Sequence, residues 1–528
     1  MTTTDELRLV SHEANGLRLD VREAVAVRVV RAADSVAFYL SLFEDEIDER
    51  LGELTAQAAV TTLGDSEPDQ VALNLEPTDA LVVSKPDGTI AVARGGACNV
   101  PLYRCVAGGL LVVSTALPVD GEGALSFAGL LDSVAVAGVA YRHDNNVVLR
   151  APLAGWYRLR RGGVSRLAPG ENLAENLIEH ARAVTPLGRD ALIAAMRSAL
   201  SDFGARQRRL RSKALVEFSG GIDSTVATLG ARMHDVTVRG ISVHFPFYEF
   251  RYEDGIQQAA AEALQVRRHV LDGTAMHSFT PPAHWPRLDE PATIVMAVHR
   301  NQTIAGIAAG AAIDRIYVGE GGDELFAEDM LEPLPVMAAL PRELFSGRAW
   351  GVIERTRQCA LAQPSLRNRS RMISIYDARL DVTMKEAYGT ATRSPFTDLA
   401  MARCGLQWAM LTRELGEPHS KRILAEAFAQ DMPDAVRDRR GKVCWDGVFA
   451  RAYATHEETI LAVFDRNRRV LGHLGIDVRW LTRRVGELAR WERTTYGADD
   501  GAVFACYGLA TWLESWGIRD AAEHEWMP

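Results

Sequence analysis

The sequence predicts a chain of two unlike parts: a β-rich α+β part, then an α/β part with a parallel sheet that runs into a mainly helical C-terminal region. The length of 528 residues exceeds what one hydrophobic core usually serves. Short apolar runs separated by turn residues fill positions 1 to about 170. After a Thr-Pro-Leu-Gly break at 185–188, strand-like runs alternate with runs of helical spacing. We therefore expect one domain at 1–185 and a second at 186–528.

In the first part, three short apolar runs at 80–84, 89–93 and 110–114 are typical of strands. The Pro-Asp-Gly sequence at 86–88 predicts a hairpin turn between the first two. Residues 35–56 are expected to form a helix that interrupts the strands.

In the second part, apolar residues recur at helical spacing from 190 to 209. The expected elements that follow are strands at 214–218, 236–245, 266–271 and 314–319, and helices at 224–233, 252–264 and 292–312. Strands that alternate with helices form a parallel sheet covered on both faces.

Composition narrows the classes of function. The net charge of -10 argues against a dedicated nucleic-acid binder. Six cysteines without a Cys-x-x-Cys pair fit a reducing compartment and no zinc site. The N-terminus lacks the pattern of a signal peptide, and the apolar runs are shorter than the roughly 20 residues of a spanning helix. We expect a cytoplasmic protein without a membrane partner.

A glycine turn links the first strand of the second part to the next helix. It contains Ser219, Gly220, Gly221, Asp223 and Ser224. Backbone N–H groups at a helix N-terminus attract an anion, and glycine lets a phosphate approach the backbone closely. The serines add hydroxyl donors, and the aspartate suits a Mg²⁺ that neutralises phosphates. An empty strand-to-helix turn is the alternative from this motif alone.

A second cluster follows the expected strand at 314–319, and it contains Gly319, Gly322 and Asp323. Parallel strands place their carboxyl ends at one sheet edge, where open α/β sheets bind ligands. We therefore expect both glycines beside the nucleotide, and Asp323 to share one metal ion with Asp223. An acidic surface loop is the alternative interpretation.

These motifs resemble a known family. Ser-Gly-Gly-Ile-Asp-Ser at 219–224 looks like the pyrophosphate loop of the ATP-pyrophosphatase enzymes, and Gly-Glu-Gly-Gly-Asp-Glu-Leu-Phe at 319–326 is similar to the second loop of asparagine synthetases. Tyr-Asp at 376–377 and Arg-Ser-Pro-Phe-Thr-Asp at 393–398 resemble the segment that follows in that family. Arg-Gly-Lys at 440–442, with Asp-Gly-Val after it, resembles the region of its catalytic lysine.

The first part resembles the later half of that family's glutaminase domain, through Arg-Gly at 94–95 and Pro-Leu-Tyr at 101–103. The resemblance implies an N-terminal Ntn-hydrolase-like sandwich followed by an ATP-pyrophosphatase domain. It also implies that a substrate carboxylate attacks ATP, with Mg²⁺, to give an acyl-adenylate that an amine then opens. Lys442 would stabilise the charge that grows in this reaction, although a solvated lysine in a basic run is the alternative.

The sequence departs from the family at two sites. A glutaminase of this type needs a cysteine at position 2, where this chain has Thr2. Ala391 stands where asparagine synthetases, in our alignment, keep a glutamate. We therefore expect an inactive first domain, a nitrogen source other than glutamine, and a pocket not built for aspartate.

An inactive glutaminase joined to an adenylating domain resembles two kinds of enzyme in which the amine and the carboxylate belong to one substrate. Our first hypothesis is a lasso-peptide cyclase, which closes a macrolactam from an N-terminal amine and an Asp or Glu side chain. A precursor peptide is then the partner, with a leader peptidase and a leader-recognition protein as further candidates. The basic runs at 206–213 and 437–442 would suit an acidic peptide, although solvated faces explain such runs as well.

Four other hypotheses remain at this point. A β-lactam synthetase would need a tyrosine–glutamate base, for which Tyr376 is a candidate while Ala391 removes the obvious glutamate. An ammonia-dependent asparagine synthetase and a non-catalytic scaffold are further alternatives. A tRNA-modifying enzyme is disfavoured by the acidic charge balance and the lack of paired cysteines.

Overall fold

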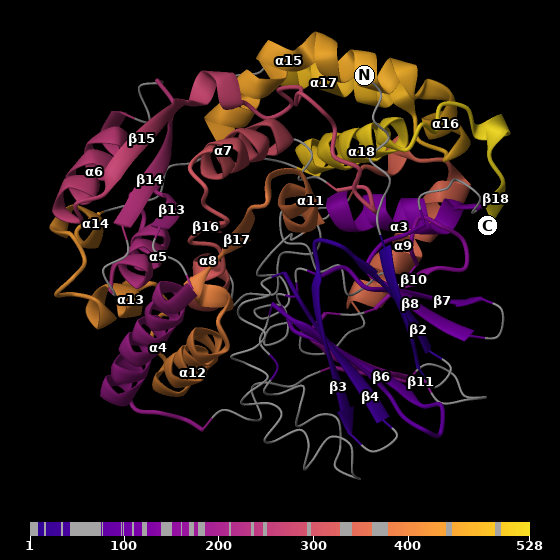
Figure 1. Cartoon of the computed structure of the whole chain (residues 1–528). Coiled ribbons are helices and arrows are strands. Elements are labelled where there is room, and N and C mark those ends of the chain that lie inside the picture. The colour runs from indigo at the N-terminus through magenta and orange to yellow at the C-terminus, as the bar shows by residue number, and fades with distance from the viewer. Residues whose placement is uncertain are drawn as a thin grey trace.

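The structure of the chain is a computed structural model, and it has three main sheets and a helical C-terminal region (Figure 1). No helix among the described residues has the length and apolar character needed to cross a membrane. The residues described are 9–14, 17–32, 35–42, 75, 78–96, 98, 100–107, 110–118, 124–138, 150–159, 161–167, 174–177, 185–210, 213–233, 237–246, 251–292, 297–327, 340–361, 379–439, 446–490 and 498–527.

Two sheets make up the first part of the chain. One has the strand order β1-β2-β8-β7-β10 and the other β12-β11-β6-β5-β4-β3. Apolar side chains of both sheets, such as Leu19, Phe38 and Val113, share one buried cluster, so the sheets pack face to face. The strands are β1 (Leu9–Ala14), β2 (Leu17–Arg22), β3 (Ala26–Ala32), β4 (Ser35–Ser41), β5 (Ala80–Ser84), β6 (Ile90–Arg94), β7 (Tyr103–Ala107), β8 (Leu110–Ser114), β10 (Tyr157–Arg158), β11 (Gly163–Leu167) and β12 (Ala174–Leu177).

The three strands expected in this part are confirmed, and so is the turn between β5 and β6. Gly88 has a φ of 79° there, and its N–H donates to the carbonyl of Lys85 at 3.0 Å. The helix expected at 35–56 is wrong where the structure describes it, because β4 occupies Ser35–Ser41. Alternating Val36, Phe38 and Leu40 pair β4 with β3 and β5, and burial between two strands outweighs the helical spacing.

The third sheet is parallel, with the strand order β15-β14-β13-β16-β17. The alternation of strands and helices expected after residue 186 is confirmed. The strands are β13 (Lys213–Glu217), β14 (Thr237–His244), β15 (Arg267–Asp272), β16 (Arg315–Tyr317) and β17 (Ala391–Arg393), and the helices of this region are α4 (Arg189–Leu210), α5 (Ile222–Arg232), α6 (Arg251–Ala263), α7 (Val298–Gly310), α8 (Gly322–Phe326), α11 (Arg379–Tyr388) and α12 (Leu399–Leu415).

The C-terminal region is helical, as expected. Its apolar side chains share one large core with α3 (Phe127–Gly138) of the first part, which packs against α9 and α18. The last strand, β18 (Trp526–Met527), pairs with β9 (Leu125–Ser126). The helices are α9 (Gly347–Leu361), α13 (Arg422–Ala427), α14 (Asp434–Arg437), α15 (Asp446–Arg466), α16 (Arg468–His473), α17 (Val478–Ala489) and α18 (Ala498–Ser515).

Buried ion pairs join the first part to the second. Arg22 of β2, whose side chain is 4% exposed, pairs with Asp289 and with Glu386 of α11. Arg158 of β10 pairs with Glu290, which is 1% exposed. A buried ion pair of this kind makes the arrangement of the two parts specific, because either charge alone would be costly to bury. The division at 185–186 stays a prediction.

Candidate active site

Two glycine-containing loops lie at the switch point of the parallel sheet. The order β15-β14-β13-β16-β17 reverses direction between β13 and β16, and ligands bind at such a point beyond the carboxyl ends of the strands. Residues 219–221 follow β13, and residues 318–321 follow β16. The two loops expected from the sequence are therefore brought together at one sheet edge.

The first loop presents hydrogen-bond donors at the start of α5. Helix α5 begins after Gly221, which caps it without a side-chain hydrogen bond. The hydroxyls of Ser219 and Ser224 lie 3.0 Å apart, and the N–H of Ser219 donates to the Ser224 hydroxyl at 3.3 Å. Gly220 has a φ of +68°, a conformation that favours glycine. Backbone N–H groups and two hydroxyls at a helix N-terminus suit a phosphate.

The second loop packs tightly against the first through its glycines. A Cβ atom on Gly319 would lie 2.7 Å from the Ser224 nitrogen and 2.8 Å from the Asp223 Cβ. A Cβ on Gly322 would lie 2.5 Å from the Asp223 Cγ. Only glycine at these two positions lets the loops approach so closely, and this approach brings Asp323 beside Asp223.

Lys421 bridges the two aspartates. Its ammonium group forms an ion pair with Asp223 and lies 2.7 Å from Asp323 Oδ1. Burial disfavours the charged form of Lys421, but the two carboxylates outweigh that effect, so the pKa of the lysine is raised. Both aspartates thus reach one small volume that holds a positive charge.

The residues present fit a Mg²⁺ ion. Among the described residues, no three His, Cys, Asp or Glu side chains form a metal-binding cluster. Mg²⁺ usually takes one or two carboxylates and completes its shell with water and substrate phosphates. Asp223 and Asp323 would supply two such oxygen ligands, and the position of the Lys421 ammonium indicates where a cation is stabilised.

Arg439 contacts the first loop and the helix α6. Its guanidinium donates to the carbonyl of Gly220 at 3.5 Å and forms an ion pair with Glu253 of α6. Burial raises the pKa of Glu253, and the charge of Arg439 opposes this rise. This arginine of the second basic run therefore contacts the candidate phosphate loop.

Arg206, from the first basic run, has a structural role. It forms an ion pair with Asp398, which is 1% exposed and also accepts from the Ala400 N–H at the start of α12. Within the segment at 393–398 that carries the family resemblance, Arg393 and Phe396 are also buried. These residues hold the sheet and α12 together.

Two glutamates, Glu320 of the second loop and Glu324 of α8, have a raised pKa. Burial raises the pKa of Glu324 to about 7, with Asp323 and Asp223 adding repulsion. Desolvation by the surrounding protein raises the pKa of Glu320 well above its ordinary value, and Glu217 and Asp381 reinforce the rise. The Glu320 side chain nevertheless remains accessible, because it borders a cavity beside the loop. Such shifts are frequent at functional sites.

The predicted site residues thus fall into two groups. Those of the two loops, from Ser219 to Ser224 and from Gly319 to Asp323, lie together. Lys442 and Tyr376 lie outside the described residues, as does position 2, so their roles stay predictions. The sequence did not single out Lys421, and it predicted Glu320 only as a neighbour of the candidate metal site. Ala391 lies buried in β17, where it lines the cavity.

Comparison with known proteins gives a family match for slightly more than half of the chain. Residues 195–469 match the family described as asparagine synthase. No curated protein matches the sequence. Among similar solved structures is the U34-tRNA thiolase NcsA from Methanococcus maripaludis with its 4Fe-4S cluster, at 14% identity and a TM-score of 0.20, covering 48% of this chain and 82% of that chain.

Proposed function

This chain belongs to the asparagine synthase family, and we propose that it joins an amine and a carboxylate carried by one substrate. Members of the family are ATP-dependent amide-forming ligases, and the chain is an enzyme of this kind. The observation that carries the proposal is the convergence of Asp223 and Asp323 on Lys421 beside the loop at 219–224. This arrangement suits the phosphates of ATP.

The reaction has two steps. A carboxylate oxygen of the substrate attacks the α-phosphorus of ATP, and the bond to the bridging oxygen breaks so that pyrophosphate leaves. The amine nitrogen then attacks the acyl carbon, the C–N bond forms, and AMP leaves with the electrons of the C–O bond while a proton leaves the nitrogen. Ser219, Ser224 and the start of α5 hold the pyrophosphate portion.

A Mg²⁺ ion held by Asp223 and Asp323 would neutralise charge on the phosphates. Arg439, at the carbonyl of Gly220, adds a fixed positive charge beside the loop. A preorganised charge at such a site stabilises the transition state more than it would in water. Lys442 is our candidate for the cation beside the acyl carbon.

The most specific form of the proposal is closure of a macrolactam in a peptide, as in lasso-peptide cyclases. Thr2 in place of a cysteine supports an inactive glutaminase-like first domain, and this favours an amine that arrives with the substrate. The buried Ala391, where we align a glutamate of asparagine synthetases, supports a carboxylate other than aspartate. A precursor peptide is the proposed partner, and a leader peptidase and a recognition protein are its candidate companions.

The test is exchange of labelled pyrophosphate into ATP by the purified full chain, with peptides that carry a free N-terminus and an internal Asp or Glu. We expect exchange that depends on the peptide, and a product lighter by one water. The N-acetylated peptide should support exchange without loss of water, and Asp323→Asn should abolish both. Exchange with a small β-amino acid but with no peptide would identify a β-lactam synthetase. Asparagine formed from aspartate and ammonium would identify an asparagine synthetase.

A further inference from the structure

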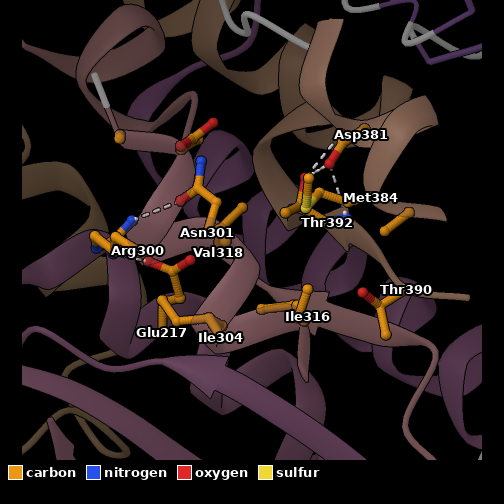
Figure 2. Close-up of a pocket in the computed structure, with 14 residues that line it drawn as sticks. Glu217, Arg300, Asn301, Ile304, Ile316, Val318, Asp381, Met384, Thr390 and Thr392 are labelled. Atoms are coloured by element: carbon orange, nitrogen blue, oxygen red, sulfur yellow. Dashed lines mark hydrogen bonds and ion pairs between the residues drawn. The ribbon is translucent and has the colours of Figure 1, made fainter. Parts of the chain in front are cut away.

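A cavity of about 140 Å³ lies directly beside the candidate active site. Strands β13, β16 and β17 line it from one side, and α7 and α11 from the other (Figure 2). Two of its lining residues connect it to the loops of the site. Glu217 ends β13 two residues before Ser219, and Glu320 belongs to the loop after β16. A group in this cavity would therefore lie next to the bound nucleotide.

The charged lining of the cavity is mainly negative. Its charged residues are the carboxylates of Glu217, Glu320 and Asp381 and the guanidinium of Arg300. Arg300 forms an ion pair with Glu217 (Figure 2). Asp381, which is 4% exposed, accepts hydrogen bonds from the N–H and the hydroxyl of Thr392. The carboxylates outnumber the single arginine, so the electrostatic energy of this cavity favours a bound cation over a neutral or negative group.

Thr390 gives an independent indication of a ligand. It is 1% exposed, and its hydroxyl has no hydrogen-bond partner among the described residues. Figure 2 shows this hydroxyl on the side of Thr390 that faces Ile316, across the cavity. A buried hydroxyl without a partner destabilises the fold, and native proteins rarely leave one without a reason. A donor placed in the cavity would satisfy it.

We propose that this cavity binds the attacking amine of the substrate as an ammonium group; the inference rests on the amide-forming function proposed above. An ammonium carries three N–H donors and no acceptor, which matches the carboxylates of the cavity and the hydroxyl of Thr390. A cavity of roughly 150 Å³ holds a molecule the size of benzene. The cavity therefore has room for an ammonium group with a small substituent, such as that of an N-terminal glycine or alanine.

The bound ammonium must lose a proton before it reacts. It passes one proton to a cavity carboxylate, and the raised pKa of Glu320 favours that transfer. The nitrogen lone pair then forms the C–N bond, the C–O bond to AMP breaks, and the second proton leaves the nitrogen for water. The carboxylate returns its own proton to water, so the cycle balances.

Calorimetric titration of the full chain with glycinamide tests the proposal, and N-acetylglycinamide is the matched probe without a basic amine. We expect glycinamide to bind and the acetylated compound not to bind. Thr390→Val and Asp381→Asn should each weaken glycinamide about tenfold or more, the value of one hydrogen bond to a charged group. Glu262→Gln, on the exposed surface of α6, is the control and should leave binding unchanged.

A crystal of the full chain soaked in glycinamide should show its amine among Glu217, Asp381 and Thr390. Water alone in the cavity would overturn the proposal, as would equal binding of both probes or unchanged binding by the Thr390→Val chain. Thr390→Val also controls for misfolding, since it removes an unsatisfied hydroxyl and preserves shape. Pyrophosphate exchange is measured separately. If glycinamide binds but the chain shows no pyrophosphate exchange with any peptide, the proposed function is refuted and the assignment of the cavity still holds.

Discussion

Replacing Lys421 by methionine tests whether Asp223 and Asp323 form a cation site. The change keeps the length of the side chain and leaves two neighbouring carboxylates without their shared ammonium group. Removal of one partner from a buried ion pair costs about 3–5 kcal/mol. The side chains of Lys421, Asp223 and Asp323 are 19%, 21% and 40% exposed, so solvent screens part of the repulsion. We expect the free energy of unfolding to fall by about 2 kcal/mol.

Magnesium should then restore the lost stability. In Lys421→Met the two carboxylates are available to the metal, whereas in the natural chain Lys421 competes for the same oxygens. A ligand at one hundred times its Kd stabilises the folded state by about 2.7 kcal/mol, which is enough to offset the loss. Urea unfolding with and without MgCl₂ measures both effects, and Lys421→Met with Asp323→Asn is the control. The reasoning is refuted if Lys421→Met is as stable as the natural chain, or if magnesium stabilises the double variant equally.

Three further changes test other parts of the site and its support. Gly322→Ala puts a Cβ against the carboxylate of Asp223, so pyrophosphate exchange should fall at least tenfold while circular dichroism stays unchanged. Arg22→Met leaves buried carboxylates of the second part uncompensated, and we expect urea unfolding to show a loss of about 3 kcal/mol. Burial lowers the pKa of both His277 and His456 below the ordinary 6.5. The charge of Arg451 lowers the pKa of His277 further, and His277 lowers that of His456. The neutral rings therefore favour the folded state above pH 6.5, and this stability is lost as the pH falls through the lowered pKa values. We expect His456→Gln to reduce the loss, which is measured as the free energy of unfolding across this pH range.

The loops of the site were predictable from the sequence because each has a local signature. A short apolar strand and a glycine turn appear together at 214–221 and again at 314–322, and a run of helical spacing follows the first turn. The parallel sheet follows from the alternation of such runs, and it places both loops at one edge. The convergence of Asp223 and Asp323 was therefore expected from topology alone, before any contact was known.

Lys421 had no such signature. It lies 198 residues from Asp223 along the chain, just before α13, and no spacing sets it apart from the other basic residues among the 59 lysines and arginines. Its role depends on how α13 packs against α4 and α5. The cavity was missed for the same reason, since Glu217 of β13 is far along the chain from Asp381 and Thr390. The helix expected at 35–56 failed because pairing of β4 with two neighbouring strands is a tertiary effect.

The first part of the chain is expected to matter to the amide step even without chemistry of its own. Glu386, which pairs with Arg22 of β2, belongs to α11, the helix that carries Asp381 into the cavity. Val382 of α11 and Ala391 of β17 pack within the apolar cluster of the first two sheets. One wall of the cavity is therefore built on these sheets. An inactive glutaminase-like domain would then be retained because its removal would leave that wall without support, and the amine without a defined position beside the adenylate.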